Sequence, residues 1–186
     1  MDKGNVRKCG VQYEGSFKLN GEHLMHIVPI KKEHIEGFRK TLDQVAREGK
    51  YLLLLKAPSV KSVKRFVLSN IKNKFTQFVV LEADKVIGWC DICPMEHPTT
   101  KHIGILGMGL LPEYRGKGIG ADLLKKCLMH AKSRGLEIVQ LDVYTSNKGA
   151  IHLYKKLGFS IEGIRKRARK HKGKYNDLVL MAKYLK

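Results

Sequence analysis

The stretch Leu111–Lys126, LPEYRGKGIGADLLKK, constrains the fold of this chain more than any other part of it. It follows an apolar run, residues 102–111, that is typical of a strand, and its last residues begin a helical pattern. Three glycines lie within the six residues 115–120, and glycine lets successive backbone N–H groups turn inward without a Cβ in the way. The first amides and the dipole of the following helix add positive potential at the same point. A strand, a glycine turn and a helix in this order favour a diphosphate-binding site.

Two well-known phosphate loops do not fit this stretch. The nucleotide-hydrolase loop, G-x-x-x-x-G-K-[ST], would need glycine at Leu111 and serine or threonine at Gly118. The dinucleotide loop, G-x-G-x-x-G, follows the first strand of a βαβ unit, whereas the spacing here is G-x-G-x-G and falls late in the chain. Taken alone, the stretch also fits a purely structural turn between a strand and a helix.

The remaining pattern predicts one domain, residues 23–186, after a basic and weakly patterned extension, residues 1–22. Strands alternate with amphipathic helices, and the helix expected over residues 58–73 is expected to bury Val63, Phe66, Val67 and Ile71. Strands are expected at 23–30, 77–83, 85–95, 102–111, 137–144, 159–170 and 174–185, and helices at 32–49, 58–73, after Gly120 and at 146–157.

The net charge of +19 attracts polyanions without choosing among nucleic acid, a phosphorylated cofactor and an acidic substrate. The basic run Arg165–Lys174 fits a solvated turn between the last two strands, and it also fits attraction of phosphates, an acidic substrate or ribosomal RNA. We favour the solvated turn, because aromatic residues for stacking on bases are scarce there. The longest apolar run, Tyr51–Leu55, is too short to span a bilayer, and we expect a cytoplasmic protein without a membrane partner.

Cys90 and Cys93 in WCDIC resemble a redox pair, but they lie within a predicted strand. Residues three apart on a strand point to opposite faces, so the two thiols would diverge. Redox and metal chemistry are therefore not expected here.

Two motifs about thirty residues apart form a joint signature. The glycine stretch fits [RQ]-x-x-G-x-[GA], and the later stretch SNKGAIHLYKKLGF fits N-x-x-A-x-x-L-Y-x-x-x-G-F. Together they resemble the GNAT superfamily of acetyl-CoA-dependent N-acetyltransferases, over residues 24–185 and most nearly the bacterial members that acetylate amino acids or other small amines. The matching residues are Arg115, Gly118, Gly120, Asn147, Ala150, Leu153, Tyr154, Gly158 and Phe159.

The resemblance implies an α+β fold, the acyl-CoA N-acyltransferase (GNAT) fold, in which a central, mixed, mostly antiparallel twisted sheet is flanked by about four helices. It also implies acetyl-CoA as co-substrate, held where two neighbouring strands splay apart, and no metal. Backbone groups at residues 108–110 would pair with the pantetheine arm and stabilise the oxyanion, and the glycine loop would hold the pyrophosphate. The cofactor-binding residues so implied are Met108, Gly109, Leu110, Arg115, Gly116, Lys117, Gly118, Ile119, Gly120, Asn147, Ala150 and Tyr154.

The resemblance also implies catalytic roles. A phenol with a pKa near 10 can protonate a departing CoA thiolate, which makes Tyr154 the expected general acid, although the residue also fits the core face of its helix. Asn147 also fits a plain helix cap. For the general base, Asp91 and Glu82 are the candidates through an ordered water, and His102 is a third, while each also fits a structural or exposed position.

We therefore expect an N-acetyltransferase that moves an acetyl group from acetyl-CoA to a primary amine of a small molecule, by direct attack in a ternary complex. The alternatives are an acetyltransferase for a protein N-terminus or lysine, of the ribosomal-protein type, and a non-catalytic basic module that binds RNA or ribosomes. The expected partners are acetyl-CoA and a small amine rather than nucleic acid, and a homodimer is left open.

Overall fold

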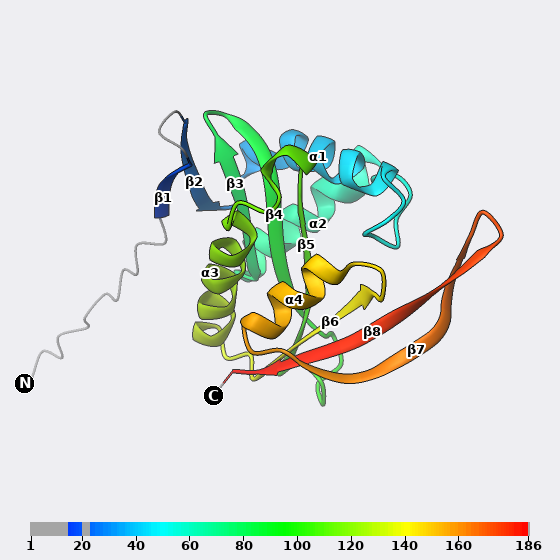
Figure 1. Ribbon diagram of the computed structural model, residues 1–186. Helices are drawn as coiled ribbons and strands as arrows, with labels where there is room; N and C mark the ends of the chain where they lie inside the picture. The colour runs from blue at the N-terminus through cyan, green and yellow to red at the C-terminus, as the bar shows by residue number, and fades with distance from the viewer. Residues whose placement is uncertain (1–14, 20–22, 186) are drawn as a thin grey trace, which may run out of the picture.

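The computed structural model describes residues 15–19 and 23–185 (Figure 1). Eight strands of this part of the chain form one sheet in the order β1-β2-β3-β4-β5-β6-β8-β7. Every neighbouring pair is antiparallel except β5 and β6, which are parallel. The mixed, mostly antiparallel sheet predicted from the sequence is thereby confirmed. The strands are β1 Gly15–Leu19, β2 His23–Pro29, β3 Thr76–Glu82, β4 Lys85–Pro94, β5 Ile103–Leu110, β6 Ile138–Tyr144, β7 Ser160–His171 and β8 Lys174–Tyr184.

Helices cover both faces of the sheet. The strand β4 shows which helix lies where, since neighbouring residues of a strand point to opposite faces. Trp89 packs edge-on against Phe38 of α1, and the thiol of Cys127 on α3 donates to the carbonyl of Cys90. In Figure 1, α3 and α4 accordingly lie in front of the sheet, and α1 and α2 lie behind it. The helices are α1 Ile35–Arg47, α2 Val60–Asn73, α3 Ile119–Ser133 and α4 Lys148–Lys156, with short 3-10 helices η1 Lys32–His34 and η2 Pro112–Tyr114.

The four α-helices and the β3–β4 hairpin lie where the sequence predicts them. The buried face of α2 differs: Val63, Val67 and Asn70 are buried, whereas Phe66 and Ile71 are 38% and 36% exposed. A polar contact accounts for this difference. The side-chain amide of Asn70 donates to Oε1 of the buried Gln77 at 2.9 Å, and this hydrogen bond holds the Asn70 side of α2 toward the sheet. None of the helices in the described part of the chain is long and apolar enough to cross a membrane.

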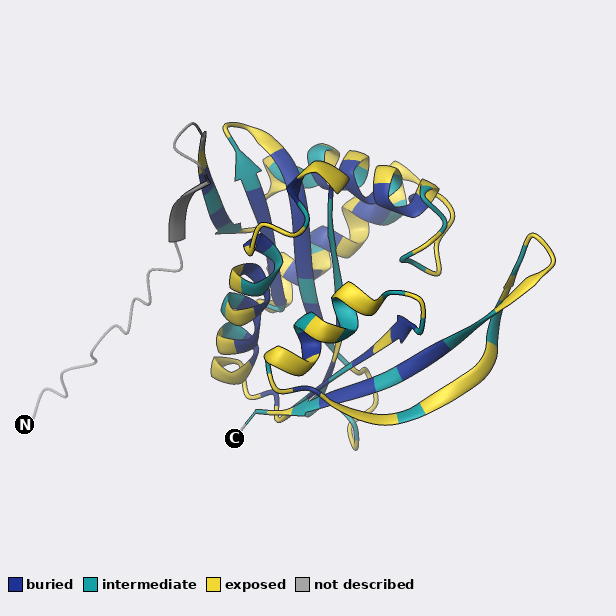
Figure 2. Ribbon diagram, viewed as in Figure 1, coloured by how far each residue is buried: buried dark blue, intermediate teal, exposed yellow. Residues whose placement is uncertain are grey.

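The two ends of the sheet depart from the predicted pattern. Residues 15–19 form β1, which pairs with β2, although the sequence indicated an unpatterned extension through residue 22. The rest of that extension, residues 1–14 and 20–22, lies outside the described residues. At the other end, the basic run Arg165–Lys174 is mostly part of the edge strand β7, and only Lys172 and Gly173 form the turn. Figure 2 shows β7 largely exposed and β8 buried along its middle, and β7 is the edge strand that carries most of the basic residues.

The parallel pair β5–β6 separates along its length. Its pairing covers only residues 103–105 of β5 and 138–140 of β6. Beyond this point β5 continues beside β4 as far as Leu110, and β6 continues beside β8 as far as Tyr144. The backbone of residues 106–110 therefore has no strand partner on the side of β6. Apart from the Leu110 carbonyl, which accepts from Nε of Arg115, backbone groups that a sheet would pair are available there to a ligand of extended shape.

Candidate active site

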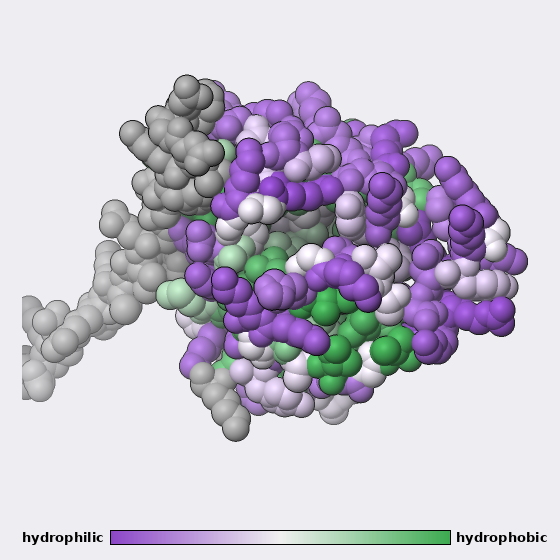
Figure 3. Space-filling view, in the orientation of Figure 1, coloured by the Kyte–Doolittle hydropathy of each residue, from purple (hydrophilic) through white to green (hydrophobic). Residues whose placement is uncertain are grey.

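Three parts of the sequence signature meet at the start of α3. A Cβ placed on Gly120 would lie 3.5 Å from Cδ1 of Leu110, and 3.6 Å from both Cδ2 of Leu153 and Cε of Met108. Thus the end of β5, the glycine loop and α4 pack together beside the opening between β5 and β6. The molecular face seen in Figure 3 is hollowed near its centre, where a pale and apolar floor is surrounded by hydrophilic residues.

The glycine loop has the backbone geometry of an anion site. Gly116 and Gly118 have φ angles of 74° and 86°, in the left-handed region that favours glycine. Nothing lies within 4 Å of the place where a Cβ would stand on either residue, so the loop faces open space. Gly118 is the N-cap of α3, and the buried side chain of Ile119 anchors the helix start. The ammonium of Lys117 lies nearby, 5.8 Å from the ring centroid of Tyr114. This cradle fits a pyrophosphate at a helix N-terminus.

The side chain of Arg115 binds protein groups of its own chain and does not extend freely into the glycine loop. Its guanidinium forms a two-pronged ion pair with Glu48, with N–O distances of 2.8 and 2.5 Å, and its Nε donates to the carbonyl of Leu110. It also stacks on the ring of Tyr51 at 4.6 Å. The residue therefore fastens the loop after α1 to the end of β5. Its expected charge contribution at the pyrophosphate is compensated by Glu48, which no local sequence pattern reveals.

Tyr154 lies on the α3–α4 side of the sheet, in the last turn of α4. Its ring is 5.6 Å from that of Phe159, and the side chain is 7% exposed. Burial, together with the nearby Cys90, holds the pKa of the phenol well above its usual range. The phenol is therefore neutral and carries its proton at physiological pH, which is the form a general acid needs. Cys90 pairs directly with Met108 on β5, so Tyr154 lies close to the edge of the opening.

The helix that carries Tyr154 begins at Asn147. The Oδ1 of Asn147 accepts a hydrogen bond from the backbone N–H of Ala150 at 3.3 Å, which is the cap geometry expected from the sequence. Asn147 also lines a pocket described below, so its side chain can cap the helix and face a ligand at the same time.

The three candidates for the general base lie in different places. Asp91 points to the α1 face and pairs with Gly107, whose Cβ position would be 3.2 Å from Oδ2 of Asp91. Although the side chain keeps some exposure, burial raises its pKa to about 7, and a hydrogen bond from Trp89 acts against this shift. A carboxyl with such a pKa can take up a proton at neutral pH. Asp91 is thus next to the strand that borders the opening, on the face opposite to Tyr154.

Glu82 and His102 have other surroundings. Glu82, at the end of β3, accepts a hydrogen bond from the hydroxyl of Tyr114 at 2.5 Å. Burial and this bond raise the pKa of Tyr114 to about 12. His102 precedes β5, at the end of the strand away from Leu110, and its carbonyl accepts from the backbone of Glu137. The structure therefore does not bring Glu82 or His102 to Tyr154.

Within the described part of the chain, the thiols and metal-binding side chains form no second centre. Cys90 is buried on one face of β4, and burial raises the pKa of the Cys93 thiol to about 12, so neither sulfur is an activated thiolate. Among residues 15–19 and 23–185, no three His, Cys, Asp or Glu side chains are grouped as metal ligands.

A pocket of about 300 Å³ was not foreseen from the sequence. Its walls come from three segments: the loop after α1, the end of β6 with the start of α4, and the β7–β8 hairpin. Sequence patterns could not find it, because its polar residues are far apart in the chain. The lining residues are Gly49, Lys50, Tyr51, Tyr144, Ser146, Asn147, Arg169 and Asn176.

Comparison with known proteins agrees with this geometry. Residues 50–159, more than half of the chain, match the acetyltransferase (GNAT) family. The chain is 31% identical over 118 residues to a [ribosomal protein bS18]-alanine N-acetyltransferase of Haemophilus influenzae, covering 63% of this chain and 77% of that protein. It is 28% identical over 108 residues to an L-amino acid N-acetyltransferase of Escherichia coli, covering 58% and 67%. The matches to two longer curated relatives span only 21% and 26% of those proteins.

Solved structures share the whole fold. An acetyltransferase of the GNAT family from Streptococcus pneumoniae superposes with a TM-score of 0.80 at 25% identity, covering 86% of this chain and 99% of that one. An acetyltransferase from Salmonella typhimurium, solved with its cofactor acetyl-CoA, gives 0.82 at 16% identity, covering 87% and 94%. The fold and the paired glycine and tyrosine motifs agree with the match to this family. The chain belongs to the GNAT acetyltransferase family, a family of N-acetyltransferases.

Proposed function

We propose that this chain transfers the acetyl group of acetyl-CoA to a primary amine of a small molecule, by direct attack within a ternary complex. One observation carries this: the neutral, buried phenol of Tyr154 lies beside the free backbone edge of β5, next to an open glycine cradle. Amides of residues 108–110 would hold the pantetheine arm, and the loop 115–120 would hold the pyrophosphate. The thioester would then lie between Tyr154 and the face that carries Asp91.

The proposed step needs a base, an oxyanion donor and an acid. The amine nitrogen attacks the thioester carbonyl, forming the C–N bond while a β5 backbone N–H stabilises the developing oxyanion. Asp91 accepts the proton that the amine releases, through a bridging water. The C–S bond breaks as the phenol of Tyr154 donates its proton to the departing thiolate, and solvent returns a proton to the phenolate. Tyr154 begins in the protonated state that burial favours. Asp91 must begin ionised, and with a pKa of about 7 a substantial fraction of the carboxyl is ionised at neutral pH.

A second candidate acceptor is the N-terminus of a ribosomal protein. It is supported by the 31% identity to the enzyme from Haemophilus influenzae, whose name gives that substrate. The two readings share the acetyl-CoA half of the site and differ only in the acceptor. Assays with amino acids, other small amines and N-terminal peptides in parallel distinguish them.

The direct test is consumption of acetyl-CoA by the purified protein across that set of amines. Tyr154→Phe should lower kcat by about a hundredfold or more, because it removes the acid, and leave acetyl-CoA binding by calorimetry unchanged. Tyr184→Phe, which removes an exposed phenol on β8, is the matched control. Unchanged turnover in Tyr154→Phe across pH would refute the acid assignment. Absence of acetyl-CoA binding by the wild-type protein would refute the function.

A further inference from the structure

The pocket at the end of β6 holds two buried polar atoms with no hydrogen bond of good geometry among the described residues, and the Arg169 guanidinium lies close enough to the Tyr144 phenol to interact with it. One is the hydroxyl of Tyr144, whose side chain is only 3% exposed, and the other is Nη2 of Arg169. A buried polar group without a hydrogen bond costs about 1–3 kcal/mol of stability, so two such groups in one small cavity indicate a binding site for a ligand. Both groups can donate hydrogen bonds, and the ligand atoms that suit them are acceptors.

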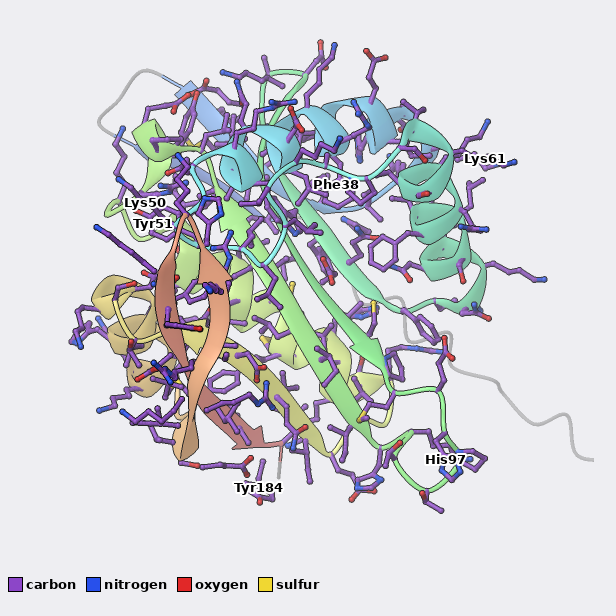
Figure 4. All side chains as sticks on the ribbon, turned by 90° about the vertical axis from the view of Figure 1, so that its right-hand side faces the viewer. Phe38, Lys50, Tyr51, Lys61, His97 and Tyr184 are labelled. Atoms are coloured by element: carbon purple, nitrogen blue, oxygen red, sulfur yellow. The ribbon has the colours of Figure 1, made fainter. Side chains whose placement is uncertain are left out.

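Arg169 is held rigidly in the pocket. Its Nη1 donates to the carbonyl of Gly49 at 3.0 Å, and its guanidinium lies 5.3 Å from the ring centroid of Tyr144. This bond joins the β7–β8 hairpin to the loop after α1. Figure 4 views this side of the molecule and shows Lys50 and Tyr51 close to the tip of the hairpin. Nη1 is therefore used by the protein, whereas Nη2 makes no hydrogen bond of good geometry within the described residues.

The charges around the pocket are positive. Lys50 and Arg169 both line it, and none of the described lining residues is a carboxylate. The two acidic residues next to the lining in the sequence, Glu48 and Asp177, are paired with Arg115 and Lys166. Burial raises the pKa of the Tyr144 phenol while the nearby Arg169 opposes the shift, so the hydroxyl keeps its proton as a donor. A carboxylate, with two oxygens that accept from a guanidinium and a hydroxyl, matches both the charge and the donors.

The pocket also has the right position for an acceptor. Tyr144 ends β6, and Tyr51 is fastened by Arg115 to the end of β5, so the pocket lies at the mouth of the opening between these strands. Asn147, in its wall, caps the helix that carries Tyr154. A positive pocket further favours the uncharged form of a bound amine, which is the form that attacks.

We propose that Arg169 and Tyr144 form a carboxylate-binding subsite for the acceptor, so that the substrates are small amines that carry a carboxylate. This inference rests on the proposed acetyltransferase function and assigns its specificity to two residues outside the glycine and tyrosine motifs. An amine whose carboxylate is bound at Arg169 is held by one end, with its nitrogen free to face the opening.

The test compares each amino acid with its carboxamide, which keeps the amine and removes the charge. The wild-type protein should acetylate the acids with a kcat/KM at least about tenfold higher. Arg169→Gln should lower kcat/KM for the acids by about tenfold to a hundredfold, mainly through KM, with little change for the amides. Tyr144→Phe should give a smaller loss of the same selectivity. Lys170→Gln, which removes an exposed charge from the same strand, should leave selectivity as in the wild type.

Acetyl-CoA affinity and unfolding by urea show whether each variant keeps its fold, and Tyr144→Phe tests the subsite without removing the bond to Gly49. Equal kcat/KM for acids and amides in the wild-type protein would overturn the subsite while leaving acetyl transfer intact. An equal loss for acids and amides in Arg169→Gln would assign Arg169 a structural role and overturn its part in recognition. If the wild type acetylated no amine at all, the proposed function itself would fail.

Discussion

Replacing Asp91 by asparagine should change how the stability of this protein depends on pH. Burial raises the pKa of the Asp91 carboxyl from 3.8 to about 7. Between these values the folded chain holds a proton that the unfolded chain has released, so the Asp91 contribution to stability falls as the pH rises. Below about pH 4 both states are protonated, and above about pH 7 both are ionised, so the loss is then complete.

The magnitude follows from the size of the shift. Each pKa unit corresponds to about 1.4 kcal/mol, so about three units give at most about 4 kcal/mol, reduced by the partial exposure of the side chain. Because asparagine does not titrate, Asp91→Asn should gain stability relative to the wild type as the pH rises, by about 2–3 kcal/mol at neutral pH and above.

Urea unfolding at about pH 5, about pH 6.5 and about pH 8 measures this difference directly. Asp84→Asn, which removes an exposed carboxylate from the turn before the same strand, controls for the change in net charge. A wild-type-to-variant difference for Asp91→Asn that stays constant over this pH range would show that burial does not perturb the carboxyl. It would also remove the argument that Asp91 is poised as a base.

Three further substitutions test the packing around the site. Gly109→Ala would place a Cβ 2.4 Å from the buried ring of Trp89, so it should lower the free energy of unfolding in urea by about 1–3 kcal/mol. Gly149→Ala has open space around it in α4, so it should raise that free energy by about 0.5–1 kcal/mol. An equal change in the free energy of unfolding in the two glycine variants would contradict the close approach of Gly109 to Trp89. Glu48→Gln should cost about 1–3 kcal/mol, because it leaves the guanidinium of Arg115 without its ionic partner, and an unchanged unfolding midpoint would count against that pair.

Local signals in the sequence located most of the fold. Alternating apolar residues, a short polar turn and capping side chains act over a few residues, so the β3–β4 hairpin, α3 and α4 could be predicted. The strand β1 could not, because its residues carry too weak a pattern for a strand that gains its hydrogen bonds from β2. The face of α2 was misassigned at Phe66 and Ile71, because apolar spacing ignores a buried polar pair such as that of Asn70.

The site divides in the same way. The glycine cradle and Tyr154 belong to short motifs, so the sequence indicates them directly. The ion pair of Arg115 with Glu48 spans 67 residues, and the contact of Arg169 with Gly49 spans 120. Such pairs depend on how the sheet brings distant segments together, and the spacing of apolar residues along the sequence does not predict them. The carboxylate subsite was for that reason invisible before the structure.

The wall of the pocket that comes from the β7–β8 hairpin has an evolutionary consequence. The match to the family ends at residue 159, whereas Arg169 and Asn176 lie beyond it. The segment that matches the family model therefore contains the glycine cradle and Tyr154 but not the hairpin wall. If the subsite is as proposed, mutations in one hairpin can redirect the enzyme to a new acceptor while the transfer chemistry stays untouched. Descendants of one ancestral chain can in this way come to use different acceptor substrates while they keep the same acetyl-transfer residues.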